Sequence, residues 1–317
     1  MDVNAGAGKK ATHVLVLGGA GFIGQHVVRA LQARGCRVTV GSRHPGRRQR
    51  DGNDGGRYRQ ARLERLLDAD DWAPLLDDCD AVVNCVGILR QRGRETYQRV
   101  HHLAPAALAA ACRRRGLRLV HVSALGFDNH LRSRFLRSKQ DGEQALRSSG
   151  ADWHIVRPSL LDGEGGNGGA KWIRRVARWP LHPLPRGANG RIAVMDCSDL
   201  GEAIAHLVLD GAEVREHELG GLETRTIAEH LAAMRALHCA RPARQVPIPD
   251  WLALLTAHAC DLLHATPFSF GHWELLQRDN CPRDNRLPVL LGRAPRTVGA
   301  TPAMATPPVV PTAEATA

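Results

Sequence analysis

A run of apolar residues that leads directly into a glycine-rich turn is the feature that most constrains the fold of this chain. Residues 14–17 are continuously apolar and predict a buried strand. Gly18 follows at the strand end, and Gly21 and Gly24 follow at intervals of three residues. Gly18 permits a sharp turn, Gly21 leaves room for phosphate oxygens, and Gly24 permits close packing of the next helix on the sheet. The pattern predicts a site that holds a pyrophosphate.

The residues after the turn complete a strand–helix–strand unit. A helix that begins with Phe22 and Ile23 runs to a stop at Gly35, and a second strand follows at 37–40. The free amide groups and the positive dipole end of this helix face the expected anion. A glycine turn that only reversed the chain would not need this context, so we predict dinucleotide binding.

Strand and helix patterns alternate along the chain and predict an α/β fold, a doubly wound parallel sheet of the Rossmann type with a small C-terminal α-rich lobe. Strands are expected at 58–63, 81–86, 117–123, 153–157 and 216–219, and helices at 70–76, 104–115, 137–148, 171–179, 198–209 and 226–237, with an irregular, proline-broken stretch up to 185. The expected divisions are a flexible N-terminus (1–11), a dinucleotide-binding domain (12–160), a smaller substrate or partner lobe with segments that return to the sheet (161–300) and a disordered tail (301–317).

The composition argues against several functions. The net charge is +11, but only four of the 43 basic residues are lysines, and the arginines are spread along the chain rather than gathered in one stripe. We therefore predict no specific nucleic-acid partner, and an arginine surface that binds nucleic acid or lipid is a minor alternative. The eight cysteines form no Cys-x-x-Cys pair and the sixteen histidines form no ligand motif, so we expect reduced thiols and no metal site.

No segment has the pattern of a membrane span. The most apolar stretch, at 251–263, is interrupted by His258 and Asp261 and predicts a packed amphipathic helix. The polar residues before the first strand do not resemble a signal or transit peptide. We expect a cytoplasmic location, with a peripheral position at the inner membrane as the alternative.

The end of the second strand indicates which dinucleotide is preferred. A carboxylate there would accept hydrogen bonds from an unmodified ribose, but the sequence reads Gly41-Ser42-Arg43. Arg43 can make charge-assisted bonds to a 2′-phosphate, and Ser42 can add a neutral one. We predict that NADP(H) is preferred and that NAD(H) binding is possible.

Several motifs together resemble an extended or atypical short-chain dehydrogenase/reductase. They are the glycine turn, residues 84–87, Ser123, Lys139 and the strand end at 157–159, and their order agrees throughout 13–160. More narrowly, residues 84–89, 121–126, 136–139 and 246–252 resemble the nucleotide-binding accessory subunit of respiratory complex I and its bacterial relatives, and this similarity reaches to about residue 298.

The resemblance implies a role for particular residues. In the wider family a serine, a tyrosine and a lysine four residues later carry out hydride transfer, and the tyrosine hydroxyl exchanges the substrate proton. Ser123 and Lys139 match, but Phe135 occupies the tyrosine position. Cofactor contacts are also expected from Val86, Gly87 and Pro158 at the ends of their strands. A solvent-exposed helix lysine and a serine bonded only to local backbone are the alternative interpretations of Lys139 and Ser123.

Two functions follow from these expectations. The preferred hypothesis is an NADP(H)-binding protein of the complex I accessory-subunit type, with weak or no turnover and with a respiratory-complex or other protein partner. The competing hypothesis is an active NADPH-dependent reductase or epimerase that acts on a small hydrophobic substrate such as a quinone-like or isoprenoid-like molecule. In that case Tyr97, near the start of the helix after the fourth strand, is a second candidate proton donor.

Overall fold

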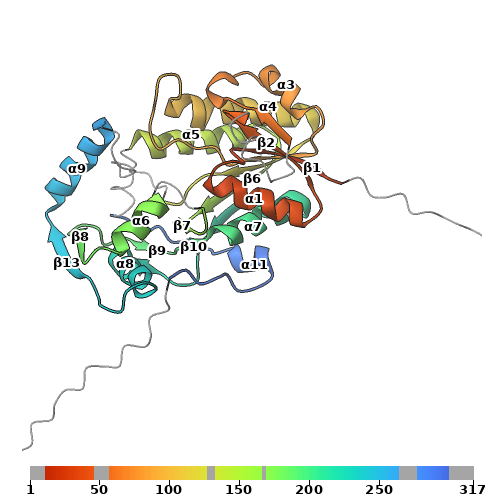
Figure 1. The fold of residues 1–317 in the computed structure, drawn as a ribbon. Coiled ribbons are helices and arrows are strands. Elements are labelled where there is room, and N and C mark those ends of the chain that lie inside the picture. The colour runs from red at the N-terminus through yellow and green to blue at the C-terminus, as the bar shows by residue number, and fades with distance from the viewer. Residues whose placement is uncertain (1–10, 46–56, 127–132, 166–168, 264–276, 300–317) are drawn as a thin grey trace, which may run out of the picture.

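The computed structural model describes residues 11–45, 57–126, 133–165, 169–263 and 277–299, except for the side chains of 257–263 (Figure 1). The terminal segments predicted to be flexible, and most of the loop after the second strand, lie outside these residues. Within the described part, no helix is both long and apolar enough to cross a membrane.

A seven-stranded sheet forms the centre of the molecule. Its strands are β1 (His13–Leu17), β2 (Arg37–Ser42), β3 (Arg57–Gln60), β4 (Ala81–Asn84), β5 (Arg118–Val122), β6 (Asp152–Pro158) and β11 (Glu216–Leu219). Their order is β11-β6-β5-β4-β1-β2-β3, and every neighbouring pair is parallel. The order reverses direction at β1, as in a doubly wound sheet, so the predicted fold class is confirmed.

Helices cover both faces of this sheet. They are α1 (Phe22–Ala33), α3 (Ala73–Leu76), α4 (Ala104–Arg115), α5 (Arg134–Ser148), α7 (Cys197–Leu209) and the short α11 (Leu287–Leu291). α1 and α7 lie on one face, and α3, α4 and α5 lie on the other (Figure 1). Alternate residues of β1 feed the two cores: Val14 and Val16 pack with α1 and α7, whereas Leu15 and Leu17 pack with α4. This two-sided burial explains why the strand reads as a continuous apolar run.

A smaller lobe follows β6 and has its own apolar core. It contains α6 (Gly169–Ala177), α8 (Ile227–Ala236), α9 (Asp250–Leu263), β8 (Leu181–Pro185) and β13 (Arg244–Ile248), with the two-residue strands β7 (Leu161–Asp162), β9 (Arg191–Ile192), β10 (Met195–Asp196) and β12 (Arg225–Thr226). Val176, Leu231 and Met234 belong to its core. β11, which lies late in the chain, joins the main sheet beside β6.

Three predicted elements differ from the structure. The strand expected at 58–63 ends at Gln60, and the 3₁₀ helix η1 (Leu63–Arg65) follows it. The helix expected at 70–76 is divided into the 3₁₀ helix η2 (Ala69–Trp72), which begins at a capping box of Asp68 and Asp71, and α3, which has Pro74 in its first turn. The proline-broken stretch forms β8, which pairs in parallel with β13 about 60 residues later.

Candidate functional site

The glycine-rich turn has a geometry that only glycine allows. Gly18 has a φ of +72°, and its amide donates to the carbonyl of Gly41 at 2.9 Å. The amide of Gly21 donates back to the carbonyl of Gly18 at 2.8 Å. A Cβ on Gly24 would lie 2.2 Å from the Gly18 oxygen, so helix α1 rests directly on the turn. The turn is therefore fixed by backbone contacts at both ends.

The N-terminus of α1 is open toward this turn. Gly21 is the N-cap and offers no side-chain acceptor, and the first turn contains no acidic residue. The amides of Phe22 and Ile23, at the first two helical positions, precede the intrahelical ladder, which begins with the amide of Gln25 bonded to the carbonyl of Gly21 at 3.0 Å. Unsatisfied amides and a positive dipole end suit a phosphate group.

The other predicted site residues lie at the same edge of the sheet. Val86 and Gly87 follow β4, Ser123 follows β5, and Pro158 ends β6. Because all the strands are parallel, these positions lie along one rim with the glycine turn. A Cβ on Gly87 would lie 3.7 Å from Nζ of Lys139, so α5 brings its lysine to this rim.

Ser123 presents a buried hydroxyl to the rim. The residue is 6% exposed, and its amide donates to the carbonyl of Val156 at 2.7 Å. Its Oγ has no hydrogen-bond partner among the residues that the structure describes. An unsatisfied buried hydroxyl costs about 1–3 kcal/mol, so the arrangement favours a ligand over a local backbone role.

Lys139 is buried, and the alternative of a solvent-exposed helix lysine is wrong. Its exposed fraction is 9%, and Nζ lies 5.8 Å from the centre of the Phe135 ring. Burial lowers the pKa of Lys139 to about 8, although the nearby Glu143 carboxylate raises it again in part. The site thus holds a desolvated cation that an anionic or hydroxyl-bearing ligand would stabilise.

His101 belongs to this cluster and was not predicted. It lies on the π-helix η3 (Gln98–Leu103), and such segments are often found at functional sites. Its Nε2 accepts a hydrogen bond from the amide of Ile88 at 3.0 Å, so Nδ1 carries the proton and donates to Oγ of Ser138 at 2.9 Å. Burial and the Lys139 charge hold the pKa of His101 well below its ordinary value. The neutral imidazole therefore ties the loop after β4 to α5.

A second neutral histidine shapes the end of β4. Nδ1 of His121 accepts from the side-chain amide of Asn84 at 3.1 Å, and Oδ1 of Asn84 accepts from the amide of Val86 at 3.0 Å. Burial first, and then the Lys139 charge, lower the pKa of His121 to about 3. Both histidines near Lys139 thus stay neutral at physiological pH.

Aromatic rings fill the position where the family tyrosine would stand. The Phe135 ring lies 5.5 Å from the His101 ring and 5.8 Å from the Tyr97 ring. The Tyr97 hydroxyl donates to the carbonyl of Leu89 at 2.8 Å. Tyr97 does approach Phe135, but its hydroxyl is directed to the loop after β4.

Ser42 and Arg43 lie at the end of β2, next to the carbonyl of Gly41 that holds the glycine turn. The Arg43 guanidinium forms an ion pair with Glu95 at 2.5 Å. The Ser42 hydroxyl accepts a long bond of 3.4 Å from the amide of His44. Both side chains are placed where the adenosine end of a dinucleotide is expected.

A cavity of about 410 Å³ lies beside α5, beyond the end of β6. Its lining includes the charged side chains Glu143, Arg147, Arg157, Glu218, Arg278, Asp279 and Arg283. The buried Glu143 carboxylate bonds to Arg157 at 2.5 Å and to Arg147 at 2.9 Å, and both arginines also bond to Glu216. The hydrogen bond from Arg147 contributes most to a pKa of about 2 for Glu216. The cavity wall is therefore polar and firmly held.

Within the described residues, no group of three or more histidine, cysteine, aspartate or glutamate side chains lies close enough to hold a metal ion. None of the seven cysteines there forms a disulfide.

A Lys139→Met variant is expected to have a free energy of unfolding about 1–3 kcal/mol higher than the unaltered protein at pH 7, measured by denaturant unfolding, because it removes a buried cation. The folded-state pKa of about 8 lies below the ordinary lysine value of 10.5. Between these values the unfolded chain binds more protons, so this group makes stability rise with pH. The difference between variant and parent should shrink over that range. Lys171→Met, at an exposed lysine, is the control and should change neither quantity. A destabilised Lys139→Met protein would contradict the prediction.

Comparison with known proteins gives consistent results. A family model described as NAD(P)H-binding matches residues 18–176, which is half of the chain. Ceramide reductase of Caulobacter vibrioides is 29% identical over 292 residues, which cover 85% of this chain and 86% of that protein. Subunit 9 of the mitochondrial NADH dehydrogenase (ubiquinone) 1 alpha subcomplex of Arabidopsis thaliana is 26% identical over 272 residues, which cover 83% and 67%.

A solved structure, the UDP-glucose 4-epimerase of Thermus thermophilus in complex with NAD, aligns with a TM-score of 0.59. The alignment has 21% sequence identity and covers 75% of this chain and 86% of the epimerase. At this identity the likeness concerns the fold.

Proposed function

Because this chain belongs to the NAD(P)H-binding family, we propose that it binds NADP(H) along the rim of the main sheet and turns it over weakly or not at all. The observation that carries the proposal is that Lys139 and Ser123 are present, whereas Phe135 stands at the tyrosine position. A buried cation and an unsatisfied buried hydroxyl are kept at the rim, but the position between them in the family pattern has no hydroxyl.

Specific groups fit the parts of the coenzyme. The amides of Phe22 and Ile23 at the open end of α1 suit the pyrophosphate, and Ser42 and Arg43 suit a 2′-phosphate. Lys139 suits the hydroxyls of the nicotinamide ribose, since a compact ammonium donates in several directions. The bound coenzyme would supply a hydride. The residues of this chain hold it and exclude water, because both Lys139 and Ser123 are buried.

The absent hydroxyl limits turnover. A positioned general acid contributes ~10² to 10⁴ in rate, or roughly 3 to 5 kcal/mol of the barrier. Phe135 cannot exchange a proton, and the Tyr97 hydroxyl is engaged by the Leu89 carbonyl. The likeness to a subunit of NADH dehydrogenase supports a role in which bound NADP(H) stabilises the chain and a surface that docks to a respiratory-complex or other protein partner.

An active reductase or epimerase is the second candidate. The likeness to ceramide reductase over most of both chains supports it, as does the cavity beside α5. The charged wall of that cavity suits the polar end of a substrate whose remainder is hydrophobic.

Nucleotide titration and a Phe135→Tyr variant separate these candidates. The purified protein is expected to bind NADPH more tightly than NADH by calorimetry. With a panel of quinone, isoprenoid and sphingoid ketones it is expected to oxidise NADPH slowly or not at all. Phe135→Tyr is expected to raise that rate by ~10-fold or more, because it restores a hydroxyl beside Lys139. Phe135→Leu, which removes the ring without adding a hydroxyl, is the control.

Two outcomes would count against the proposal. The absence of any bound nucleotide at saturating concentration would remove its basis. Rapid turnover by the unaltered protein, lost in Ser123→Ala, would favour the reductase instead.

A further inference from the structure

We propose that Glu95 is a specificity-determining residue that weakens the preference for NADPH by competing with its 2′-phosphate for Arg43. This inference rests on the proposed function. Its basis is one ion pair, in which a guanidinium nitrogen of Arg43 lies 2.5 Å from Oε1 of Glu95.

The ion pair joins two segments that follow strands on either side of β1. Arg43 directly follows β2, and Glu95 lies in the segment after β4. In the sheet, β1 lies between these two strands, and β1 leads into Gly18. The two side chains therefore meet across the place where a dinucleotide bound at the turn would leave toward its adenosine end.

Both partners are held by their backbones. The amide and carbonyl of Glu95 form two hydrogen bonds with those of Arg92, at 2.9 and 3.0 Å, in an antiparallel bridge. The carbonyl of Arg43 accepts a bond from the side chain of Gln60 at 3.3 Å. The Glu95 side chain is 20% exposed, whereas the Arg43 side chain is 56% exposed. The carboxylate is thus the more shielded partner, and the guanidinium is the more accessible one.

The chemistry of the ligand decides the effect of this arrangement. A 2′-phosphate must displace the carboxylate from Arg43 or share the guanidinium with it, and in both cases the two anions repel each other. The ribose of NADH carries a neutral hydroxyl there and makes no claim on the guanidinium charge. Glu95 therefore penalises NADPH and leaves NADH nearly unaffected.

The test is calorimetric titration of the full chain with NADPH and with NADH at low ionic strength. Glu95→Gln keeps the shape and removes the charge. It is expected to tighten NADPH binding by ~3- to 10-fold and to change NADH binding by less than about 2-fold. The gain should decrease as salt is added.

Glu213→Gln is the matched control, because it makes the same charge change on an exposed residue that precedes β11, at the opposite edge of the sheet. It should leave both affinities unchanged. Equal tightening by the two variants would reduce the effect to net charge and overturn the inference. Weaker binding of both nucleotides to Glu95→Gln would also overturn it, because the Glu95 carboxylate would then help to bind the adenosine end of either nucleotide.

An Arg43→Asp variant separates this inference from the proposed function. Loss of NADPH preference in that variant, together with unchanged affinities in Glu95→Gln, would overturn only the role of Glu95. Failure of the unaltered protein to bind either nucleotide would overturn the proposed function itself.

Discussion

Gly24→Ala is expected to destabilise the folded protein by about 3 kcal/mol and to weaken NADPH binding at least ~100-fold. The added Cβ would lie 2.2 Å from the carbonyl oxygen of Gly18, 2.5 Å from Cα of Gly19 and 2.7 Å from the carbonyl carbon of Gly18. These are backbone atoms of the turn, so no side chain can rotate to make room. Helix α1 would have to move away from the turn that it helps to shape.

Chemical unfolding and nucleotide titration measure the two effects. Gly169→Ala is the control, because a Cβ there meets nothing within 4 Å, and it should be neutral or slightly stabilising at the start of α6. A Gly24→Ala protein with the parent's unfolding midpoint and NADPH affinity would show that the turn and helix can separate freely, and would remove the support for a preformed phosphate site.

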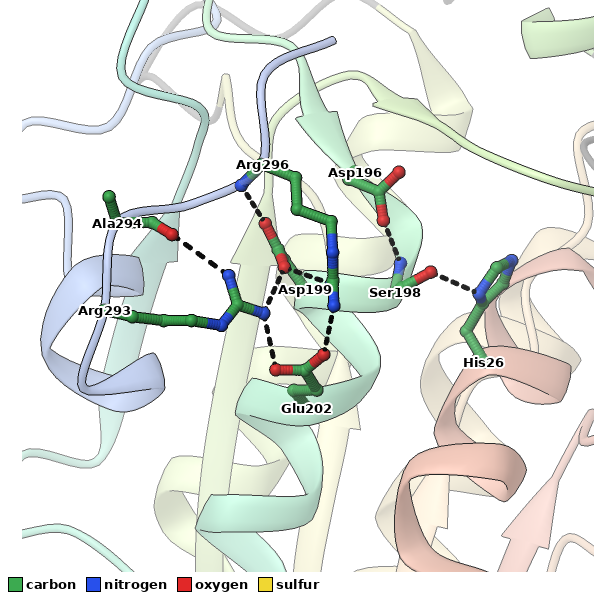
Figure 2. A network of polar contacts seen from close by, with 8 residues as sticks. All are labelled: His26, Asp196, Ser198, Asp199, Glu202, Arg293, Ala294 and Arg296. Carbon is green, nitrogen blue, oxygen red and sulfur yellow. Dashed lines mark hydrogen bonds and ion pairs between the residues drawn. The ribbon is translucent and has the colours of Figure 1, made fainter. Parts of the chain in front are cut away.

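Asp199→Ala is expected to lower the free energy of unfolding by about 3 kcal/mol, whereas Glu202→Ala should cost less than about 1 kcal/mol. Both carboxylates bond to Arg293 and Arg296, as Figure 2 shows. Asp199 is completely buried and also accepts the backbone amide of Arg296 at 2.6 Å. The Glu202 side chain is 40% exposed, so water can take the place of its hydrogen bonds to Arg293 and Arg296 when it is removed.

The surroundings of Asp199 explain why its removal should destabilise the whole fold and not one helix alone. Asp199 lies in the first turn of α7, where its charge also favours the helix dipole. On the preceding residue, Oγ of Ser198 lies 3.1 Å from Nδ1 of His26 on α1 (Figure 2). α7 therefore joins α1 to the last described segment of the chain. Urea unfolding of the two variants tests the contrast, and equal effects at both sites would contradict it.

Local patterns predicted the central unit well. The apolar run of β1, the glycine turn and the stop at Gly35 depend on residues close in sequence, and each has the expected geometry. Packing on both faces of the sheet follows from the same apolar run. Elements that depend on distant partners were harder to predict. The β8 strand contains prolines, and only its pairing with β13 makes it a strand.

The site shows the same division. The residue types of Lys139 and Ser123 pointed to the rim, but their degree of burial is a property of the packed structure. His101 gave no readable signal, because a π-helical turn and two hydrogen bonds to other segments define its role. The pairing of Arg43 with Glu95 joins loops that follow different strands, so the sequence pattern indicated a phosphate contact and gave no sign of a competing carboxylate.

The unsatisfied hydroxyl of Ser123 and the buried ammonium of Lys139 affect how long the protein survives degradation in the cell. A nucleotide that satisfies both groups at a concentration about 100 times its dissociation constant would add about 2.7 kcal/mol to the free energy of unfolding. Unloaded chains would open more often and would be the ones that proteases degrade. We expect the abundance of this protein in a growing cell to follow the supply of its nucleotide.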